Sequence, residues 1–316
     1  MSATCPACGD AGMRLLFDAT DRLYRTTRKN FRVVECENCR LVRLHPWPSA
    51  DELRHYYPEC YWFSPGRDTA SRLEESYRRF VLRDHLAFVL RAVEDAGEDG
   101  VILDVGCGGG LLLGMLQEHG LRVAGLDNSK AAASAARINN RVGVVCGDLS
   151  CAPLRAGGFS VVTMFHVVEH LPDAASYLSA ARELLAPDGR LVVQVPNASS
   201  WQFLLLGSHW NGIDVPRHLV DYRESDLRGL LERCGFEVVR RKNFSLRDNP
   251  AGLASSVAPE LDPTARRVRK IHESGAARLA KDLLYFALVI AALPFTMLEA
   301  LCGAGSTIML EARKKA

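Results

Sequence analysis

A glycine-rich turn near residue 106 constrains the fold of this chain more than any other feature. Val101–Val105 is a largely apolar run that predicts a buried strand, and Leu111–Glu118 predicts a helix. Gly106–Gly110 contains four glycines, which let the backbone turn sharply and approach a ligand where any Cβ would collide. A strand, a glycine turn and a helix in this order open a doubly wound nucleotide-binding sheet, so the sequence predicts an α/β fold.

Further strands and helices alternate after this turn at the spacing of βαβ units. Together with Val101–Val105, the predicted strands would form a seven-stranded Rossmann-like sheet. Ligands of such sheets bind outside the carboxyl ends of the strands, so residues that end strands are the candidate ligand contacts. The further predicted strands are Leu121–Leu126, Val142–Cys146, Phe159–Phe165, Arg190–Val195, Phe236–Arg240 and, much later, Ser306–Ala312.

Acids stand at three of these strand ends and carry a family resemblance. Asp104 precedes the first glycine of a G-x-G-x-G turn by two residues, Asp127 ends the second strand, and Asp148 follows the third. The chain thereby resembles the class I S-adenosylmethionine (SAM) methyltransferases over roughly residues 100–241 plus the last strand. The resemblance implies that the turn wraps the methionine moiety, that Asp127 binds the ribose diol, and that Asp148 reaches the adenine. The residues implied in cofactor binding are Asp104, Gly106, Cys107, Gly108, Asp127, Asn128, Asp148, Leu149 and His166.

Two histidines are candidate general bases. Methyl transfer is an in-line attack on a sulfonium, and an oxygen or acidic carbon nucleophile must also lose a proton. His166 follows the fourth predicted strand, where this fold brings side chains toward the methyl group, and is the first candidate. His218 lies between the fifth strand and the next helix, in a stretch that forms an acceptor-side wall in this fold. Each histidine has an alternative role in packing or helix capping.

His166, Glu169 and His170 also match the H-x-x-E-H pattern of some zinc peptidases. The buried strand before them argues against that interpretation. The ubiquinone-pathway O-methyltransferases carry E-x-x-E-H here, and this chain resembles them in the shared E-H. Their acids and histidine can hold a divalent metal. Because His166 replaces the first glutamate, we expect Glu169 and His170 to anchor the loop at the catalytic site rather than to bind a metal.

The N-terminal segment contains two C-x-x-C pairs, Cys5 with Cys8 and Cys36 with Cys39. Four thiolates at this spacing can close a tetrahedral Zn²⁺ site, so the segment predicts a zinc ribbon. We expect a structural zinc, because such sites usually stabilise segments too small to bury a core. Free or redox-active cysteines are the alternative.

The predicted organisation has three parts. Residues 1–62 form the zinc ribbon and an aromatic lid segment, residues 63–99 a linking helix, and residues 100–316 the SAM-binding domain. Ser49 and Glu52 predict a capped helix start. The aromatic stretch that follows could cover the ligand cleft or pack the ribbon against the main domain.

An insertion at residues 244–305, before the last strand, is not required by the fold. It contains the basic tract Arg266–Lys270 and the apolar run Leu283–Leu298. The run is shorter than the roughly 20 residues of a membrane span, and Pro294 interrupts it, so we expect no span. Three roles remain: packing on the sheet or in a homodimer interface, capping the acceptor pocket, or lying on a membrane surface through residues 266–298.

The whole layout resembles the bacterial zinc-ribbon SAM methyltransferases, some of which methylate sugar nucleotides. We therefore expect an enzyme that uses SAM and a structural Zn²⁺ and methylates a hydroxyl or activated carbon of a nucleotide- or lipid-linked sugar or a related small metabolite. Ten cysteines fit a reducing cytoplasm, with peripheral contact at the inner membrane face as an option. The net charge of +2 gives no reason to propose nucleic-acid binding.

Two alternatives come from other classes of protein. A nicotinamide-dependent oxidoreductase is disfavoured because Leu111 stands where the dinucleotide fingerprint needs its third glycine, and because Asp148 follows the third strand. A zinc-ribbon adaptor could instead bind SAM without turnover. The intact glycine motif and the two histidines count against it.

Overall fold

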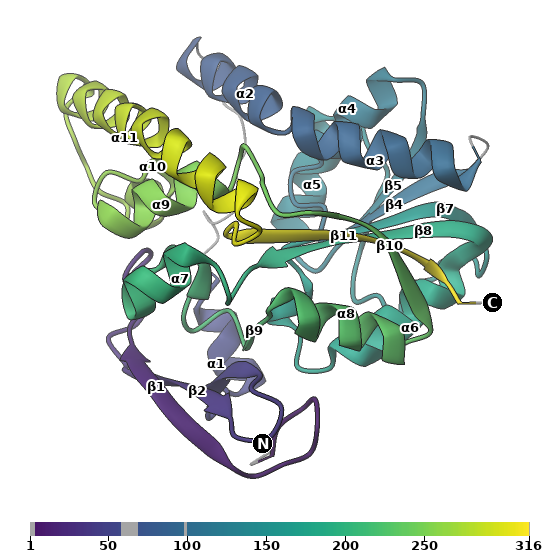
Figure 1. Cartoon of the computed structure of the whole chain (residues 1–316). Helices are drawn as coiled ribbons and strands as arrows, with labels where there is room; N and C mark the ends of the chain where they lie inside the picture. The colour runs from purple at the N-terminus through teal and green to yellow at the C-terminus, as the bar shows by residue number, and fades with distance from the viewer. Residues whose placement is uncertain (1–3, 58–68, 98–99, 316) are drawn as a thin grey trace.

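The computed structural model describes residues 4–57, 69–97 and 100–315. Its centre is a seven-stranded sheet in the order β10-β11-β8-β7-β4-β5-β6 (Figure 1). The five strands from β8 to β6 in this order are parallel, and β11 is antiparallel to both neighbours. The predicted α/β fold class is therefore confirmed. The strands are β4 (Val101–Val105), β5 (Arg122–Asp127), β6 (Val144–Cys146), β7 (Phe159–Phe165), β8 (Leu185–Pro196), β10 (Phe236–Lys242) and β11 (Thr307–Lys314).

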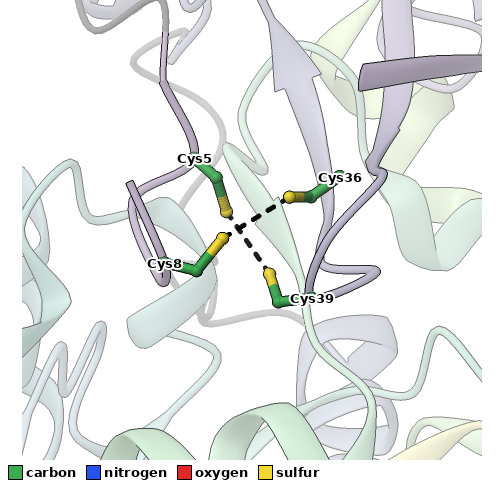
Figure 2. Close-up of side chains that lie close together, drawn as sticks. All are labelled: Cys5, Cys8, Cys36 and Cys39. Atoms are coloured by element: carbon green, nitrogen blue, oxygen red, sulfur yellow. Dashed lines mark hydrogen bonds between the residues drawn. The ribbon is translucent and has the colours of Figure 1, made fainter. Parts of the chain in front are cut away.

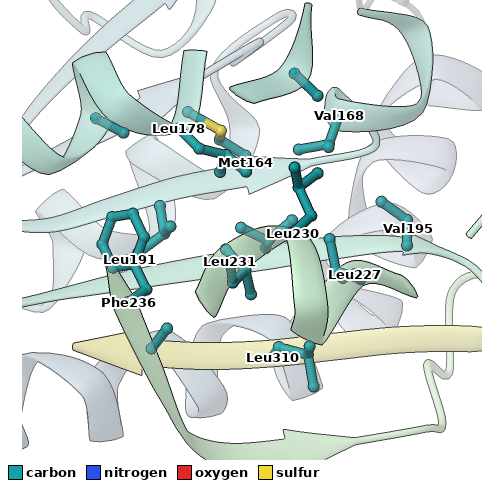
Figure 3. Packing of buried hydrophobic residues seen from close by; sticks show 14 of the residues in the cluster. Met164, Val168, Leu178, Leu191, Val195, Leu227, Leu230, Leu231, Phe236 and Leu310 are labelled. Atoms are coloured by element: carbon teal, nitrogen blue, oxygen red, sulfur yellow. The ribbon is translucent and has the colours of Figure 1, made fainter. Parts of the chain in front are cut away.

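Helices cover both faces of this sheet. On one face, α3 (Arg83–Ala96) and α4 (Leu111–Glu118) share a core with Ile102, and α5 (Lys130–Asn139) packs beside β5 and β6. On the other face, α6 (Ala174–Leu184) and α8 (Glu224–Arg233) pack on alternate residues of the same strands (Figure 3). Successive side chains of a strand point to opposite faces, which is why the buried central strands are apolar throughout.

A second, antiparallel sheet joins the N-terminal segment to the main domain. Its order is β1 (Met13–Ala19), β2 (Phe31–Cys36), β3 (Val42–His45) and β9 (Val220–Asp221). The fourth strand, β9, comes from the stretch between β8 and α8, far along the chain. The N-terminal segment is thus tied by backbone hydrogen bonds to the region that contains His218.

Two helices stand where a single linking helix was expected. α2 (Thr69–Val81) and α3 are separated at Leu82 because they pack on different partners. The stripe of α3 around Val89 packs on the sheet, whereas Tyr77 of α2 contacts Phe286 in an edge-on ring pair. Before them, α1 (Ala50–His55) begins with the predicted capping box of Ser49 and Glu52. Most of the aromatic stretch proposed as a lid lies outside the described residues.

The insertion forms three helices, α9 (Asn249–Val257), α10 (Pro263–Val268) and α11 (Gly275–Leu301). A shorter helix outside the insertion, α7 (Trp201–Leu206), precedes β9. The helix is longer than the apolar run Leu283–Leu298 noted in the sequence, and Pro294 does not interrupt it. α11 has 27 residues, runs through Pro294, and begins at a Ser274 cap that accepts from the amide of Ala277.

By length and composition, α11 alone among the helices of the described residues could cross a membrane. One stripe of α11, including Val289 and Ala292, packs on α9. The opposite side is apolar and exposed, and α11 projects from the edge of the molecule beside α2 (Figure 1). The exposed apolar residues of α11 are Leu279, Leu283, Leu284, Phe286, Ile290, Met297, Leu298 and Leu301.

Candidate active site

A cavity of about 1980 Å³ opens at the carboxyl ends of β4, β5 and β7. One part is lined by the glycine turn and the strand-end acids. The other is lined by the N-terminal segment, the stretch around His218 and the insertion. Eight of the nine residues implied in cofactor binding line the cavity. The exception is Leu149, which lies in the hydrophobic core.

The glycine turn has the geometry of a ligand cradle. Gly106 and Gly108 have φ values of +74° and +53°, a region that side chains other than glycine rarely adopt. A Cβ on Gly106 would lie 2.6 Å from Cγ2 of Val167. The amide of Gly108 donates to Oδ2 of Asp127 at 2.8 Å, which fixes the turn against the end of β5. The turn therefore presents bare backbone to the cavity, as close approach of a cofactor requires.

The two buried acids beside this turn suit a cationic ligand. Burial, together with the charge of Asp127, raises the pKa of Asp104 to about 7, although the hydroxyl of Thr163 donates to it at 2.6 Å. Burial also raises the pKa of Asp127. A positively charged group such as an ammonium or a sulfonium would stabilise both carboxylates in their ionised form. The residues present therefore fit SAM.

Asp148 is held in place at the far side of this part of the cavity. Its carboxylate accepts from the amide of Ser150 at 2.9 Å and from the hydroxyl of Tyr177. Burial opposes ionisation, but the hydrogen bonds from Ser150 and Tyr177 lower the pKa of Asp148 overall. It is thus an ionised acceptor, as recognition of an amino group requires.

His166 lies between two carboxylates. Its Nδ1 is 3.2 Å from Oε1 of Glu169. Its Nε2 is 2.8 Å from the side-chain amide of Gln194 and 3.5 Å from Oδ2 of Asp248. Burial opposes protonation, but the charges of Asp248 and Glu169 outweigh it and raise the pKa of His166 to about 9. The imidazole is therefore cationic at neutral pH. A cationic imidazole cannot accept a proton, which argues against His166 as the base.

His218 is in the opposite state. Burial and the neighbouring His170 lower the pKa of His218 to about 4, so its imidazole is neutral at pH 7. Its Nδ1 donates to the carbonyl oxygen of Gly212 at 2.9 Å, which leaves the lone pair on Nε2. His218 is buried and lines the cavity. Of the two candidate bases, His218 is therefore the one that can accept a proton.

Glu169, which is buried, and His170, which is half-buried, form a cluster with His218. The ring centroids of the two histidines are 4.6 Å apart, and Oε1 of Glu169 is 3.9 Å from Nε2 of His218. Nδ1 of His170 bonds the carbonyl oxygen of Arg217 at 3.0 Å. Within the described residues, Oε2 of Glu169 is buried without a hydrogen-bond partner.

This cluster is one of two sets in the described part of the chain whose ligating atoms lie within 4.8 Å of one another. One carboxylate and two imidazoles are ligands that divalent transition metals accept. The set differs from the predicted H-x-x-E-H pattern, because His218 rather than His166 is its third member.

The second set is Cys5, Cys8, Cys36 and Cys39 (Figure 2). The sulfurs of Cys5 and Cys39 are 3.5 Å apart, and those of Cys8 and Cys36 are 3.6 Å apart. A disulfide would require about 2.05 Å, whereas Zn–S bonds of about 2.3 Å in a tetrahedron place the sulfurs roughly 3.8 Å apart. The arrangement therefore fits a tetrahedral metal site.

Several residues of the site were missed by sequence reasoning. Asp248 accepts from the amide of Gln194 at 2.8 Å and lies 3.6 Å from Nε2 of the buried His85. Arg217 is fully buried and forms ion pairs with Asp214 at 2.6 Å and Asp21 at 2.9 Å. Of these, only His85, a polar residue inside the apolar stripe of a helix, left a signal in the sequence.

Comparisons with known proteins identify the family of the chain. A family model described as "Methyltransferase domain" matches residues 76–241, more than half of the chain. The chain is 30% identical to a ubiquinone biosynthesis O-methyltransferase of Pseudomonas paraeruginosa, over 54% of this chain and 78% of the relative. It is 32% identical to the protein of that name from Marinobacter nauticus, over 51% and 72%.

Among solved structures, the cyclase SpnF matches with a TM-score of 0.51 and 19% identity, covering 85% of this chain and 97% of that one. At that identity the match shows the shared fold alone.

Proposed function

The chain belongs to the methyltransferase domain family and is a class I SAM-dependent methyltransferase. From this premise we propose that it methylates a hydroxyl group of a small, sugar-containing acceptor, with His218 as the base. The observation that carries the proposal is the neutral, buried imidazole of His218, which lines the same cavity as the glycine turn. A hydroxyl oxygen needs such a base, because its proton must leave as the oxygen attacks. The names of the relatives in the comparisons also favour an oxygen acceptor.

The residues of the chain divide the work of the reaction. The glycine turn, Asp127 and Asp148 would hold SAM, which would supply an electrophilic methyl group. Nε2 of His218 would accept the proton that the acceptor hydroxyl loses on methylation. Glu169 and His170 are positioning residues that hold the imidazole through buried contacts. Cationic His166 stabilises the loop after β7 through its contacts with Glu169 and Asp248.

The cavity is large enough to hold SAM and an acceptor together. Pockets for one small ligand are commonly about 300–1,000 Å³, whereas this cavity has about 1980 Å³. Its acceptor part includes hydrogen-bonding groups such as Asn211 and Asp214 and the aromatic rings of Tyr24 and Trp210. Polar groups interleaved with rings suit a sugar, whose hydroxyls need partners and whose faces are apolar.

The test compares His218→Ala with His272→Ala, an exposed histidine outside the cavity. Labelled SAM is incubated with fractionated cell extract, and S-adenosylhomocysteine binding is measured in parallel. We expect His218→Ala to slow methyl transfer by about 10²-fold or more and to keep cofactor binding, with no effect of His272→Ala. Full activity of His218→Ala would remove the proposed base. Cofactor binding without transfer by the unsubstituted protein would favour the adaptor.

The four cysteines are proposed to hold one structural zinc. The support is the sulfur geometry, which suits a tetrahedral ion and not a disulfide. Elemental analysis should find about one zinc per chain, and Cys36→Ser should lose it, with Cys302→Ser as the matched control outside the cluster. A second zinc that persists in Cys36→Ser would place a metal at Glu169, His170 and His218 and would overturn His218 as a free base.

We also place the protein in the cytoplasm, with the outer face of α11 on an anionic membrane surface. Of the basic side chains at the start of α11 and in the segment before it, Lys270 and Arg278 are exposed. Arg266 and Arg269 are buried in ion pairs with acids. The apolar side of α11 follows directly, and its two ends join the same globular body through α10 and β11. A helix held in this way lies in the interface rather than across the bilayer. A homodimer through this face is the competing outcome.

A further inference from the structure

The N-terminal segment supplies one wall of the acceptor part of the cavity. Its contribution comes from the loop between β1 and β2, from α1, and from the residues that follow α1. The cavity is therefore shared between the main domain and a segment that was expected from the sequence to carry a structural metal. The lining residues of the segment are Leu23, Tyr24, Leu53, Arg54 and Tyr57.

A buried ion pair joins this segment to the residue before His218. The guanidinium group of Arg217 donates to the two carboxylate oxygens of Asp21 at 2.9 and 3.1 Å, and to the carbonyl oxygen of Tyr56 at 3.2 Å. Its other N–H groups donate to Asp214 at 2.6 and 2.9 Å. All five donors of the guanidinium group are thus used, and the side chain is fully buried. Arg217 is therefore held in one position.

Asp21 is itself fixed by its own loop. Its carboxylate accepts from the backbone amides of Tyr24 at 3.1 Å and Thr26 at 2.8 Å. The hydroxyl of Thr26 donates to it as well. The ring of Tyr24 lies against the guanidinium group of Arg217, with its centroid 4.6 Å from the guanidinium carbon. The loop between β1 and β2 therefore fixes Arg217 and also contributes Tyr24 to the wall of the cavity.

A second link from the N-terminal segment holds the residue after His218. The carbonyl oxygen of Leu219 accepts from the amide of Leu44 at 3.0 Å and from the indole Nε1 of Trp47 at 3.1 Å. The amide of Leu219 donates to the carbonyl oxygen of Glu169 at 2.8 Å. His218 thus lies between two residues that the N-terminal segment fixes.

We propose that Asp21 and Trp47 are positioning residues for methyl transfer, so that the N-terminal segment takes part in the reaction as well as carrying the proposed zinc. The inference rests on the proposed function, in which His218 is the base. The hydrogen bond from its Nδ1 to Gly212 orients the ring, and the two links fix the backbone that carries it. A base must lie within hydrogen-bond reach of the proton that it accepts, and a displacement of about 1 Å can cost on the order of 10²-fold in rate.

The experiment compares the full chain with two mild variants. Asp21→Asn keeps the shape of the side chain and removes its charge, while Arg217 retains Asp214 as a partner. Trp47→Phe keeps an aromatic ring and removes the indole N–H. Transfer of labelled methyl from saturating SAM is measured across a dilution series of the active extract fraction, which separates the maximal rate from the apparent affinity for the acceptor. Calorimetry gives the affinity for S-adenosylhomocysteine.

We expect the maximal rate to fall about tenfold or more in Asp21→Asn and roughly threefold in Trp47→Phe, which loses one hydrogen bond. The affinity for S-adenosylhomocysteine should not change, because the glycine turn and the strand-end acids belong to the main sheet. Asp18→Asn and Trp201→Phe are the matched controls and should keep the full rate. Asp18 is exposed on β1, Trp201 is half-buried in α7, and neither lines the cavity.

Hydrogen exchange adds a readout of the position of His218. The backbone amides of Arg217 and His218 donate to Asp214, and that of Leu219 donates to Glu169. In Asp21→Asn these amides should exchange faster, whereas those of the glycine turn should exchange as before.

Each outcome decides the inference. A full maximal rate in Asp21→Asn, a change confined to the apparent affinity for the acceptor, or unaltered exchange beside His218 would overturn the positioning role. A parallel loss of transfer and of S-adenosylhomocysteine binding would also overturn it, because the segment would then support the whole fold. Full activity of His218→Ala would instead remove the proposed base, whatever the result with Asp21→Asn.

Discussion

Replacing Asp248 with asparagine should return His166 to an ordinary histidine. The structure raises the pKa of His166 from 6.5 to about 9, and Asp248 is the largest cause that acts in this direction. A difference of that size corresponds to roughly 3 kcal/mol in favour of the cationic form, to which Asp248 and Glu169 both contribute. In Asp248→Asn the neutral amide keeps the shape of the side chain but removes the charge, so the pKa of His166 should fall toward 6.5.

The same reasoning fixes the direction of a pH effect on stability. Because the pKa of His166 is higher in the folded than in the unfolded chain, its contribution to stability is complete below about pH 6.5 and is lost as the pH rises through about 9. Asp248→Asn should therefore reduce the loss of stability over this range. The charged and titratable groups around the ring are Asp248 and Glu169 in contact, with His85 and Arg247 beside Asp248.

The assay is an NMR titration of the histidine Cε1–H signals. The chain has nine histidines, and His166→Gln assigns the signal of interest. Asp173→Asn serves as the control, because Asp173 caps α6 and does not contact His166. A signal that titrates near 6.5 in the unsubstituted protein, or one that Asp248→Asn leaves unchanged, would refute this account of the site.

Three further predictions follow from local geometry. Gly106→Ala should abolish S-adenosylhomocysteine binding, since the added Cβ would lie 2.6 Å from Val167. Gly120→Ala, at a similar φ but with open space around it, should retain binding. Equal affinities of the two variants in calorimetry would show that the glycine turn does not form the cofactor site. Arg217→Met should destabilise the fold by about 3–5 kcal/mol, because it leaves Asp21 and Asp214 without their cation. The melting temperature should fall by roughly 10 °C in a thermal scan. An unchanged melting temperature would show that these ion pairs do not hold the N-terminal segment against the stretch around His218. Leu284→Asp with Ile290→Asp should remove flotation with anionic vesicles without a change in melting temperature. Ile138→Asp, which changes an exposed apolar residue of α5, should not. A monomer produced from a dimer by the double variant would instead assign the face of α11 to self-association.

The cofactor half of the site could be predicted from the sequence because each of its parts is local. A glycine turn after an apolar strand and an acid at a strand end are patterns within a few residues, and the sheet then brings the strand ends together. Asp104, Asp127 and Asp148 all lie at the cavity, as their positions in the sequence implied. Leu149 does not, because the side chain after Asp148 turns into the core.

The acceptor half, apart from the stretch around His218, could not be predicted because it depends on tertiary packing. His85, Asp248 and Arg267 belong to a linking helix and an insertion, and no spacing relates them to one another or to the sheet. Their convergence follows from the packing of α3 on the sheet and of α9 on α11. The protonation states of His166 and His218 could not be predicted for the same reason. The carboxylate that keeps His166 charged comes from a segment more than 80 residues away, as the sequence numbers show.

The division between the two halves has a chemical logic. The sheet supplies the cofactor part of the cavity, and the same methyl donor serves the whole family. The insertion supplies Asp248, which contacts His166, and further residues of the cavity lining such as Arg247 and Arg267. We expect relatives with other acceptors to differ in this insertion and around His218, whereas the glycine turn stays as it is. The family model includes His218 but ends at residue 241, before the insertion begins, so it does not reach this part of the cavity.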